Sequence, residues 1–278
     1  MKNKYSGIFL LTILLGLILQ SCSVERQLAK DFIKNKRNIP VLFQSIEKLI
    51  LTNEKLKKIQ DFDKLSIEKQ DSIWNSNTLY LDSINDIILI NKIYNQIRNS
   101  LIELGFIIYS SDSIEKFQQL TQEKYLLNLA QIEVSEDIYN YRDQETFFNN
   151  LTYYQDHNLN IINLNYWFEL TDYTNNSTKV LYNTFSTSDI LNGRFTMNPD
   201  DYTVSYNYKI KSLNSEDIYK LALTSGKKNT TLLYDYLMNT YIRQNISPYY
   251  LNPKYFSYDI NTGFLYQSED EKLTILEQ

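Results

Sequence analysis

One histidine and a few pairs of neighbouring carboxylates are the residues of this chain that could do acid–base chemistry. His157 is the only histidine among 278 residues, and it directly follows Asp156. A histidine in this setting could act as a general base with a carboxylate partner. No Gly-x-Ser-x-Gly turn or other nucleophile motif accompanies it, so we expect an exposed histidine in a loop between strands.

Three acidic pairs could supply the two carboxylates that glycoside hydrolysis needs, namely Asp61/Asp63, Asp200/Asp201 and Glu216/Asp217. The pair that follows Pro199 fits a turn. The pair at 216–217 fits the first turn of a helix, where acidic side chains interact favourably with the helix dipole. We therefore expect that the protein has no catalytic residue and is not an enzyme. A hydrolase that uses only carboxylates is the least favoured alternative.

The sequence lacks the residue patterns that usually bind metals and nucleotides. The chain has one cysteine and one histidine, so a zinc site of the Cys/His type cannot be built. Its six glycines include neither Gly-x-Gly-x-x-Gly nor Gly-x-x-x-x-Gly-Lys-Ser/Thr. We expect no metal site and no cofactor.

The first 22 residues have the pattern of an export signal. Lys2 and Lys4 precede an apolar run over 5–19, and the segment ends Leu19-Gln20-Ser21-Cys22. It resembles the lipobox signal of bacterial lipoproteins, which implies cleavage after Ser21 and acylation of Cys22. The resemblance implies a Gram-negative outer-membrane lipoprotein, bound to the membrane through Cys22, with its body in the periplasm or at the cell surface. An ordinary secretory peptide with a chance cysteine is the alternative.

Three Asp-Ser-Ile tripeptides place Ser72, Ser83 and Ser113 in one common pattern. The pattern resembles the Asp-Ser/Thr-aliphatic sequon that some Gram-negative bacteria O-glycosylate on exported proteins. The resemblance implies that these serines are candidate O-glycosylation sites. Helix capping is the alternative for Ser83 and Ser113, because helical patterns follow them.

Tyrosine is abundant, with 24 residues, and many of the aromatic side chains fall on predicted strands. Tyrosine and tryptophan combine an apolar face with a polar tip, which suits a hydrated binding surface for sugars. The candidate aromatic binding surface consists of Tyr166, Trp167, Tyr206 and Tyr208. The alternative is that these side chains form cross-strand pairs and the core of the sheet.

The charge and hydropathy of the chain limit the kinds of partner that it could bind. The formal net charge is −5 and no basic patch is visible, so we expect no nucleic acid partner. No apolar run after residue 22 is long enough for a transmembrane helix. The acyl chains on Cys22 would then hold the protein at the membrane.

The first half of the chain alternates helical and strand patterns. Apolar spacing predicts helices over 23–38 and 83–104, the second ending at Gly105. Short apolar runs predict strands at 41–43, 49–51, 106–109 and 124–134, with a short helix before the last, and this order favours a partly parallel sheet. The segment 104–109, Leu-Gly-Phe-Ile-Ile-Tyr, with the helix and strand after it, resembles the small α/β domains of envelope-assembly lipoproteins.

The second half begins with alternating strands and ends with helices. Period-two patterns predict antiparallel strands at 164–170, 180–185 and 202–210, with turns at Asn192-Gly193 and 198–200. Helical patterns at 215–224 and 230–244, separated by Gly226, predict a helical hairpin. A small β-hairpin with its turn at 261–263 follows. We expect the polar stretch 139–146 to be a connection and the tail 268–278 to be loose.

These patterns predict an α+β fold with a mixed sheet. It has an N-terminal β-α-β-α-β run, antiparallel strands in the middle, a C-terminal helical hairpin and a small β-hairpin. Residues 1–21 form the signal peptide and 22–278 a single α+β domain, with a subdivision near 135–150 as the alternative.

The function that we expect is that of a non-enzymatic outer-membrane lipoprotein. It would act as a binding or assembly component of an envelope complex, with an envelope protein as its partner. The alternative is a carbohydrate-binding lipoprotein of a nutrient-capture system, with a glycan as its partner.

Overall fold

A mixed sheet forms the centre of the molecule. The computed structural model describes residues 23–147, 150–247, 254–269 and 272–276. The main sheet has the strand order β11-β6-β5-β4-β1-β3, and β2 pairs with β4 beside β1. The predicted α+β class with a mixed sheet is confirmed.

The N-terminal half supplies the parallel part of this sheet. Strands β1 (Pro40–Gln44), β2 (Ile50–Asn53) and β3 (Ile107–Tyr109) are short. Both β1 and β2 pair in parallel with β4 (Tyr125–Thr146), and β3 pairs in parallel with β1. The helices between them allow this direction, because parallel neighbours need a long crossover connection.

Two very long strands supply the antiparallel part. β4 and β5 (Thr152–Asp172) form one hairpin whose pairing extends from 125 to 172, with a register shift between Leu129 and Gln131. β6 (Ser177–Ser188) pairs with β5. The expected connection at 139–146 is therefore wrong, because β4 continues through these residues without a break.

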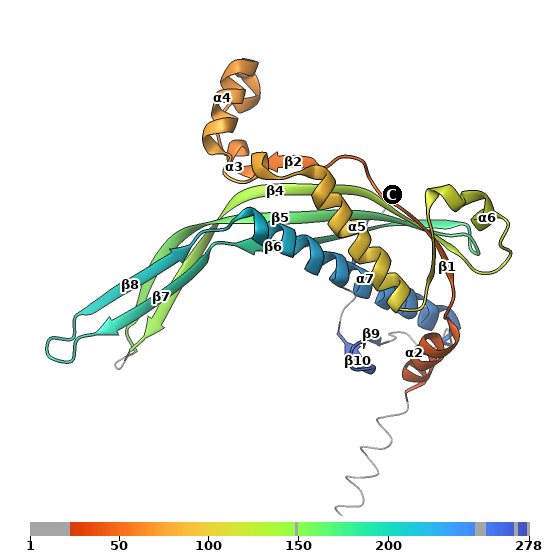
Figure 1. Ribbon diagram of the computed structural model, residues 1–278. Coiled ribbons are helices and arrows are strands. Elements are labelled where there is room, and N and C mark those ends of the chain that lie inside the picture. The colour runs from red at the N-terminus through yellow and green to blue at the C-terminus, as the bar shows by residue number, and fades with distance from the viewer. Residues whose placement is uncertain (1–22, 148–149, 248–253, 270–271, 277–278) are drawn as a thin grey trace, which may run out of the picture.

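α5 (Asp86–Glu103) and α7 (Ser215–Asn245) cover one face of the sheet, and α2 (Val24–Asn35) packs against α7. α5 also contacts α7. Figure 1 shows α5 and α7 lying across the same side of the strands. Their apolar side chains and those of the inner sheet face form one core, for example Ile97, Ile132, Phe168 and Ile218.

The predicted helical hairpin is wrong, because α7 is one continuous helix through Gly226. A Cβ at this position would lie 3.1 Å from Cβ of Gln96 and 3.3 Å from the carbonyl oxygen of Ile93, both on α5. Glycine thus lets two helices approach closely, which outweighs its cost of roughly 1 kcal/mol in a helix interior. The predicted end of the 83–104 helix is confirmed at Gly105, which has a φ of +92°.

Smaller elements sit around this body. α3 (Glu54–Lys57), η1 (Phe62–Lys64), α4 (Ile67–Asn77) and η2 (Leu81–Ser83) lie between β2 and α5. η3 (Ser111–Ser113) and α6 (Ile114–Gln118) connect β3 to β4. β9 (Tyr255–Asp259) and β10 (Phe264–Ser268) form the predicted terminal hairpin. The expectation of a loose tail is wrong for β11 (Thr274–Leu276), which pairs with β6.

Strands β7 (Ile190–Met197) and β8 (Val204–Lys211) form a separate two-stranded sheet. The turn predicted at Asn192-Gly193 is wrong, since both residues lie in β7, whereas the turn at 198–200 is confirmed between β7 and β8. Figure 1 shows β7 and β8 extending with the far ends of β4 and β5 beyond the helices. We call these four segments, residues 139–146, 152–159, 190–197 and 204–211, the β-arm.

Candidate functional site

The β-arm has a small core of its own. Leu159 and Phe195 are buried but do not belong to the main core of the body. The ring of Phe195 packs against Tyr206, with ring centroids 4.5 Å apart. Phe195 and Tyr206 are cross-strand partners within the β7–β8 hairpin. The contact between the two hairpins comes from His157 of β5, whose ring lies 5.4 Å from that of Tyr206 and 4.7 Å from that of Tyr208 between centroids.

His157 lies inside this contact. It is only 9% exposed and lies within β5, so the expectation of an exposed loop histidine is wrong. Its Nε2 lies 3.1 Å from the Tyr206 hydroxyl, which donates to Oδ2 of Asp143 at 2.8 Å. Because that hydroxyl proton goes to Asp143, Nε2 is the donor to Tyr206.

This chain of three side chains is suited to holding the hairpins together rather than to catalysis. Burial, reinforced by the hydrogen bond to Asp143 and its charge, raises the pKa of Tyr206 to about 12. The phenol therefore remains neutral near pH 7 and acts as a hydrogen-bond donor. The general base pairing of His157 with Asp156 does not form, because Asp156 is bound to Arg142 by two hydrogen bonds of 2.6 and 2.9 Å.

Gly193 makes room for this network. A Cβ there would lie 1.9 Å from the Tyr206 hydroxyl and 2.4 Å from Oδ2 of Asp143. Any side chain at this position of β7 would displace the phenol from its carboxylate. The glycine that suggested a turn thus serves close packing between two hairpins.

Large apolar side chains are exposed along the β-arm and in the turns at its end. Tyr202, in the turn between β7 and β8, is 70% exposed. Other exposed apolar side chains are Tyr139, Leu151, Tyr154, Ile190 and Tyr208. Aromatic side chains of this kind are enriched in the centres of protein–protein interfaces. The arm can therefore bury apolar area against a partner.

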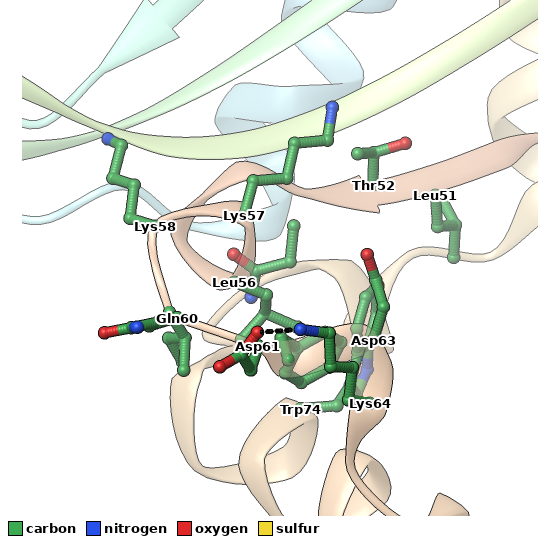
Figure 2. A pocket seen from close by; sticks show the side chains of 13 residues that line it. Leu51, Thr52, Leu56, Lys57, Lys58, Gln60, Asp61, Asp63, Lys64 and Trp74 are labelled. Atoms are coloured by element: carbon green, nitrogen blue, oxygen red, sulfur yellow. Dashed lines mark ion pairs between the residues drawn. The ribbon is translucent and has the colours of Figure 1, made fainter.

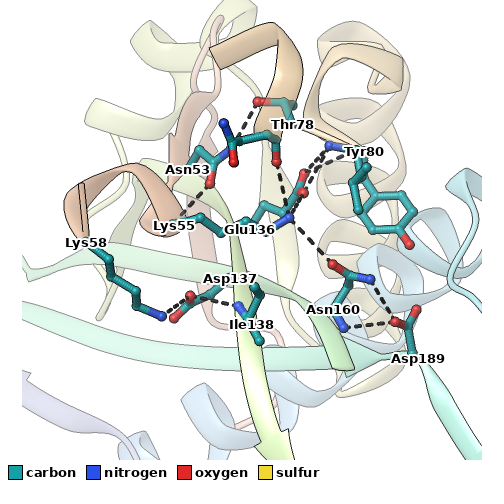
Figure 3. Close-up of polar contacts among 12 residues, drawn as sticks. Asn53, Lys55, Lys58, Thr78, Tyr80, Glu136, Asp137, Ile138, Asn160 and Asp189 are labelled. Carbon is teal, nitrogen blue, oxygen red and sulfur yellow. Dashed lines mark hydrogen bonds and ion pairs between the residues drawn. The ribbon is translucent and has the colours of Figure 1, made fainter. Parts of the chain in front are cut away.

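A buried ion pair lies where the arm meets the body (Figure 3). Glu136 of β4 is fully buried, and its Oε1 lies 2.5 Å from Nζ of Lys55 in α3. The same carboxylate accepts hydrogen bonds of 3.0 to 3.2 Å from the backbone N–H groups of Leu79 and Tyr80. A buried carboxylate is tolerated when its charge is paired and its oxygens are hydrogen-bonded, as they are here.

Asp189 fixes the neighbouring junction between β6 and β7. Its Oδ2 accepts hydrogen bonds of 2.8 Å from the backbone and side-chain nitrogens of Asn160, and Oδ1 accepts one of 2.8 Å from the backbone of Leu213. These contacts tie β5, the start of β7 and the segment before α7 to one carboxylate. Figure 3 shows the contacts with Asn160. The base of the β-arm is thus held at a fixed place on the body.

The four aromatic residues of the predicted binding surface do not lie on one surface. Tyr166 is fully buried on the inner face of β5, and its hydroxyl lies 2.6 Å from that of Ser225, so its assignment to a surface is wrong. Trp167 lies on the opposite face, 4.9 Å from Tyr182 between ring centroids. Tyr206 and Tyr208 belong to the β-arm, where Tyr206 is packed and Tyr208 is exposed.

Polar side chains surround Trp167 on its face of the sheet. The Tyr182 hydroxyl donates to Asn165 at 3.1 Å, and Asn165 donates to Glu133 at 3.1 Å. Glu133 also accepts a hydrogen bond of 2.6 Å from Thr52. These groups bind one another across the strands, as cross-strand pairs in a sheet do.

The residues predicted to be modified lie in different settings. Ser72 is exposed on α4, and Ser83 is exposed in η2, where its hydroxyl donates to the carbonyl oxygen of Tyr80 at 2.7 Å. Ser113 is half-buried in η3 and makes no capping hydrogen bond, and Asn85 rather than Ser83 caps α5. Ser21 and Cys22 lie outside the described residues, so acylation of Cys22 stays a prediction.

A groove of about 560 Å³ lies between α3, η1 and α4 (Figure 2). Its apolar lining includes Leu56, Phe62 and Trp74, and charged side chains surround it. Each of its lysines has a carboxylate partner, in the pairs Lys57–Glu54, Lys58–Asp137 and Lys64–Asp61. This groove therefore offers no unpaired positive charge to a ligand.

The acidic pairs have structural partners. Asp61 forms an ion pair with Lys64, Asp201 accepts hydrogen bonds from Thr203, and Asp217 completes a capping box with Asn214. Within the described ranges, no three His, Cys, Asp or Glu side chains are grouped to hold a metal ion. No helix in those ranges combines the length and apolar composition needed to cross a membrane.

Comparison with known proteins adds little to this description. No family model and no curated protein matches the chain. Among solved structures, the chain is similar to one from Helicobacter pylori that is named as a homologue of a neuraminyllactose-binding hemagglutinin. The sequence identity is 8% and the TM-score 0.33, over 75% of this chain and 91% of that chain. A likeness at this level supports no inference about fold or function.

Proposed function

We propose that the protein is a non-enzymatic lipoprotein of the outer membrane that binds an envelope protein through its β-arm. The body would be anchored by acylated Cys22, and the arm would reach the partner. The observation that carries this proposal is the arm itself, a projection with its own core and exposed aromatic side chains at its end.

Two features favour a docking role for the arm. Its base is fixed by the Glu136–Lys55 pair and by Asp189, so the arm presents its end in one orientation. A preorganised surface loses less conformational freedom on binding, which favours affinity. Its exposed apolar side chains can then supply the buried centre of an interface.

The anchor supports the same proposal. α2 begins at Val24, and Ser23 caps it by accepting a hydrogen bond of 3.2 Å from the backbone of Arg26. A helix that starts directly behind Cys22 leaves almost no tether between the acyl chains and the body. The body would thus stay close to the bilayer while the arm extends from it.

Site-specific photocrosslinking in cells tests the proposal. A benzoylphenylalanine introduced at Tyr154 or Tyr202 should crosslink to one or two envelope proteins, to be identified by mass spectrometry. The matched control positions are Ile67 and Ile87, which are similarly exposed but lie outside the β-arm. The crosslinks should be lost in a Cys22→Ala strain. Equal crosslinking from arm and body positions would contradict a docking role for the arm.

Glycan binding is the second candidate, and the Trp167–Tyr182 pair favours it. These rings lie on the sheet face opposite α5 and α7, where a sugar ring could stack on them. The neighbouring polar groups are already bound to one another, so stacking would have to supply most of the affinity. Glycan-array binding that is lost in Trp167→Ala but kept in Trp74→Ala would favour this function over docking.

A further inference from the structure

A second groove lies between α7 and the β9–β10 hairpin. Its volume is about 500 Å³, within the range typical of small-molecule sites. Its lining is mainly apolar and includes Phe185, Leu232, Tyr258 and Tyr266. We call it the hairpin groove.

The hairpin wall of this groove is fixed to α7. The side chain of Asn239 accepts a hydrogen bond of 2.9 Å from the backbone N–H of Phe256 and donates one of 2.8 Å to its carbonyl oxygen. One turn earlier, Oδ1 of Asp235 accepts a hydrogen bond of 2.9 Å from the backbone of Tyr258. The groove is therefore a built feature of the fold.

Positively charged side chains line the hairpin groove. Lys227, Lys228 and Lys272 line it, and none of the three has an ion pair with a carboxylate in the described part of the chain. Lys228 lies over the ring of Phe185, 5.8 Å from its centroid. This differs from the groove beside α4, where every lysine is paired.

The two carboxylates that line the groove are already occupied. Asp235 binds the backbone of Tyr258, and Asp259 accepts hydrogen bonds from Asn261 at 2.9 Å and from Thr262 at 2.8 Å. Lys272 is near Asp235, since its positive charge lowers the pKa of that carboxyl against the larger effect of burial. The groove thus holds three lysines and two carboxylates, and both carboxylates also accept hydrogen bonds from other donors. The groove combines an apolar wall with an excess of positive charge, although the chain as a whole is acidic.

We propose that the hairpin groove binds an amphipathic anion, a molecule with an acyl chain and a carboxylate or phosphate head. The acyl chain would lie along Phe185, Leu232 and Tyr266, and the head would contact the lysines. Burial of apolar area gives affinity, and the lysines select for the negative head. This site does not depend on the partner of the β-arm.

The groove lies near the start of the described chain. A guanidinium nitrogen of Arg26, in the first turn of α2, donates to the carbonyl oxygen of Leu265 in β10 at 3.5 Å. If Cys22 is acylated as proposed, the hairpin lies close to the bilayer. The anion could then be a bilayer lipid or a free fatty acid, and the experiment below separates these two sources.

Photoaffinity labelling of the full lipidated protein in phospholipid vesicles tests the proposal. Three probes carry a diazirine in the chain: palmitic acid, hexadecanol and phosphatidylglycerol. The acid, the phosphatidylglycerol or both should label peptides within 227–235 or 255–268 at least tenfold more than hexadecanol does. Labelling by the acid identifies a free fatty acid as a ligand, and labelling by phosphatidylglycerol alone identifies a bilayer lipid.

Charge reversal gives the decisive comparison. Lys227→Glu with Lys228→Glu should reduce this labelling about tenfold. The matched control is Lys69→Glu with Lys116→Glu, two exposed lysines outside the groove, and should leave it unchanged. If the first pair lowers the thermal stability of the protein, Tyr266→Ala, which alters an exposed side chain, replaces it. Equal labelling by acid and alcohol, or labelling that charge reversal leaves unchanged, would overturn the proposal.

Discussion

Single residues of the β-arm show how glycine and tyrosine can join two hairpins. Gly193 has an ordinary strand conformation, yet the space beside it is filled by the Tyr206 hydroxyl. The hydroxyl is in turn held between His157 and Asp143. The requirement for glycine thus comes from a neighbouring strand and not from its own backbone.

Gly193→Ala should loosen the arm without unfolding the body. The added methyl group would displace the phenol from Asp143, at a cost of about 1–3 kcal/mol, as overpacking typically has. Amide hydrogen exchange should rise about tenfold or more in β7 and β8, because each 1.4 kcal/mol is a factor of about ten. Asn192→Ala is the matched control and should leave exchange unchanged. Unchanged exchange in Gly193→Ala would show that the phenol does not hold the hairpins together.

Asp235 makes stability depend on pH. Burial raises its pKa from 3.8 to about 6 in the folded protein. Folding therefore favours the protonated carboxyl group. Its contribution to the free energy of unfolding is complete below about pH 3.8 and is lost as the pH rises through 6.

Asp235→Asn should remove this dependence while keeping an acceptor for Tyr258. As the pH rises from 4 to 7.5, the free energy of unfolding of the variant should increase relative to that of the wild type by up to about 3 kcal/mol. Urea unfolding at several pH values measures it. Asp259→Asn should show almost no change over this range, because the hydrogen bond from Thr262 lowers the pKa of Asp259 below 3.8 and its contribution to stability is lost only as the pH falls below about 4. A difference in the free energy of unfolding between Asp235→Asn and wild type that does not change with pH would contradict a raised pKa for the buried Asp235.

Elements in this fold depend on a few buried polar contacts between segments distant in sequence. α3 is a helix of only four residues, yet it supplies Lys55 to Glu136 of β4. The same glutamate binds the backbone just after α4. This pair therefore holds the segment from α3 to η2 against the sheet.

Lys55→Met should be strongly destabilising, because it leaves a buried carboxylate without its counter-charge. Loss of one partner of a buried pair typically costs about 3–5 kcal/mol. Lys58→Met is the matched control, since it breaks the pair between an exposed lysine and the partly exposed Asp137 and should cost less than about 1 kcal/mol. Chemical denaturation of both variants measures the difference, and similar losses would argue against this role of the pair.

Sequence patterns predicted correctly the elements whose ends and buried faces are determined by their own residues. The apolar stripe and Gly105 predicted the helix now seen as α5. Residues 261–263 predicted the turn between β9 and β10, and the alternation from 164 to 170 predicted part of β5. In each case the residues that define the element also supply its ending or its buried face.

Elements decided by distant neighbours could not be predicted in this way. Gly226 suggests a helix end until α5 is known to pass close to it. Residues 139–146 lack an apolar alternation because most of their side chains are exposed once β4 leaves the body. His157 and Tyr206 are brought together by the stacking of two hairpins, which the sequence does not reveal. The groove lysines likewise come from α7 and the tail.

At the scale of the whole molecule, the protein has a body and a projecting arm. The body combines a mixed sheet with α5 and α7 on one face, and α2 places its N-terminal end directly behind the predicted acylation site. The β-arm extends from the same long strands that form the centre of the sheet (Figure 1). This arrangement would separate the proposed anchor at Cys22 from the proposed binding surface at the end of the arm.

The proposed function requires that the end of the β-arm binds an envelope protein. Quantitative co-purification from membranes tests it directly, with a Tyr154→Ser and Tyr202→Ser variant compared with an Ile67→Ser and Ile87→Ser variant. All four side chains are more than half exposed, so both variants should fold and be anchored alike. We predict that the arm variant loses at least nine-tenths of the co-purifying partner, about 1.4 kcal/mol of binding free energy, while the body variant keeps it. Equal recovery of the partner by the two variants would contradict the claim.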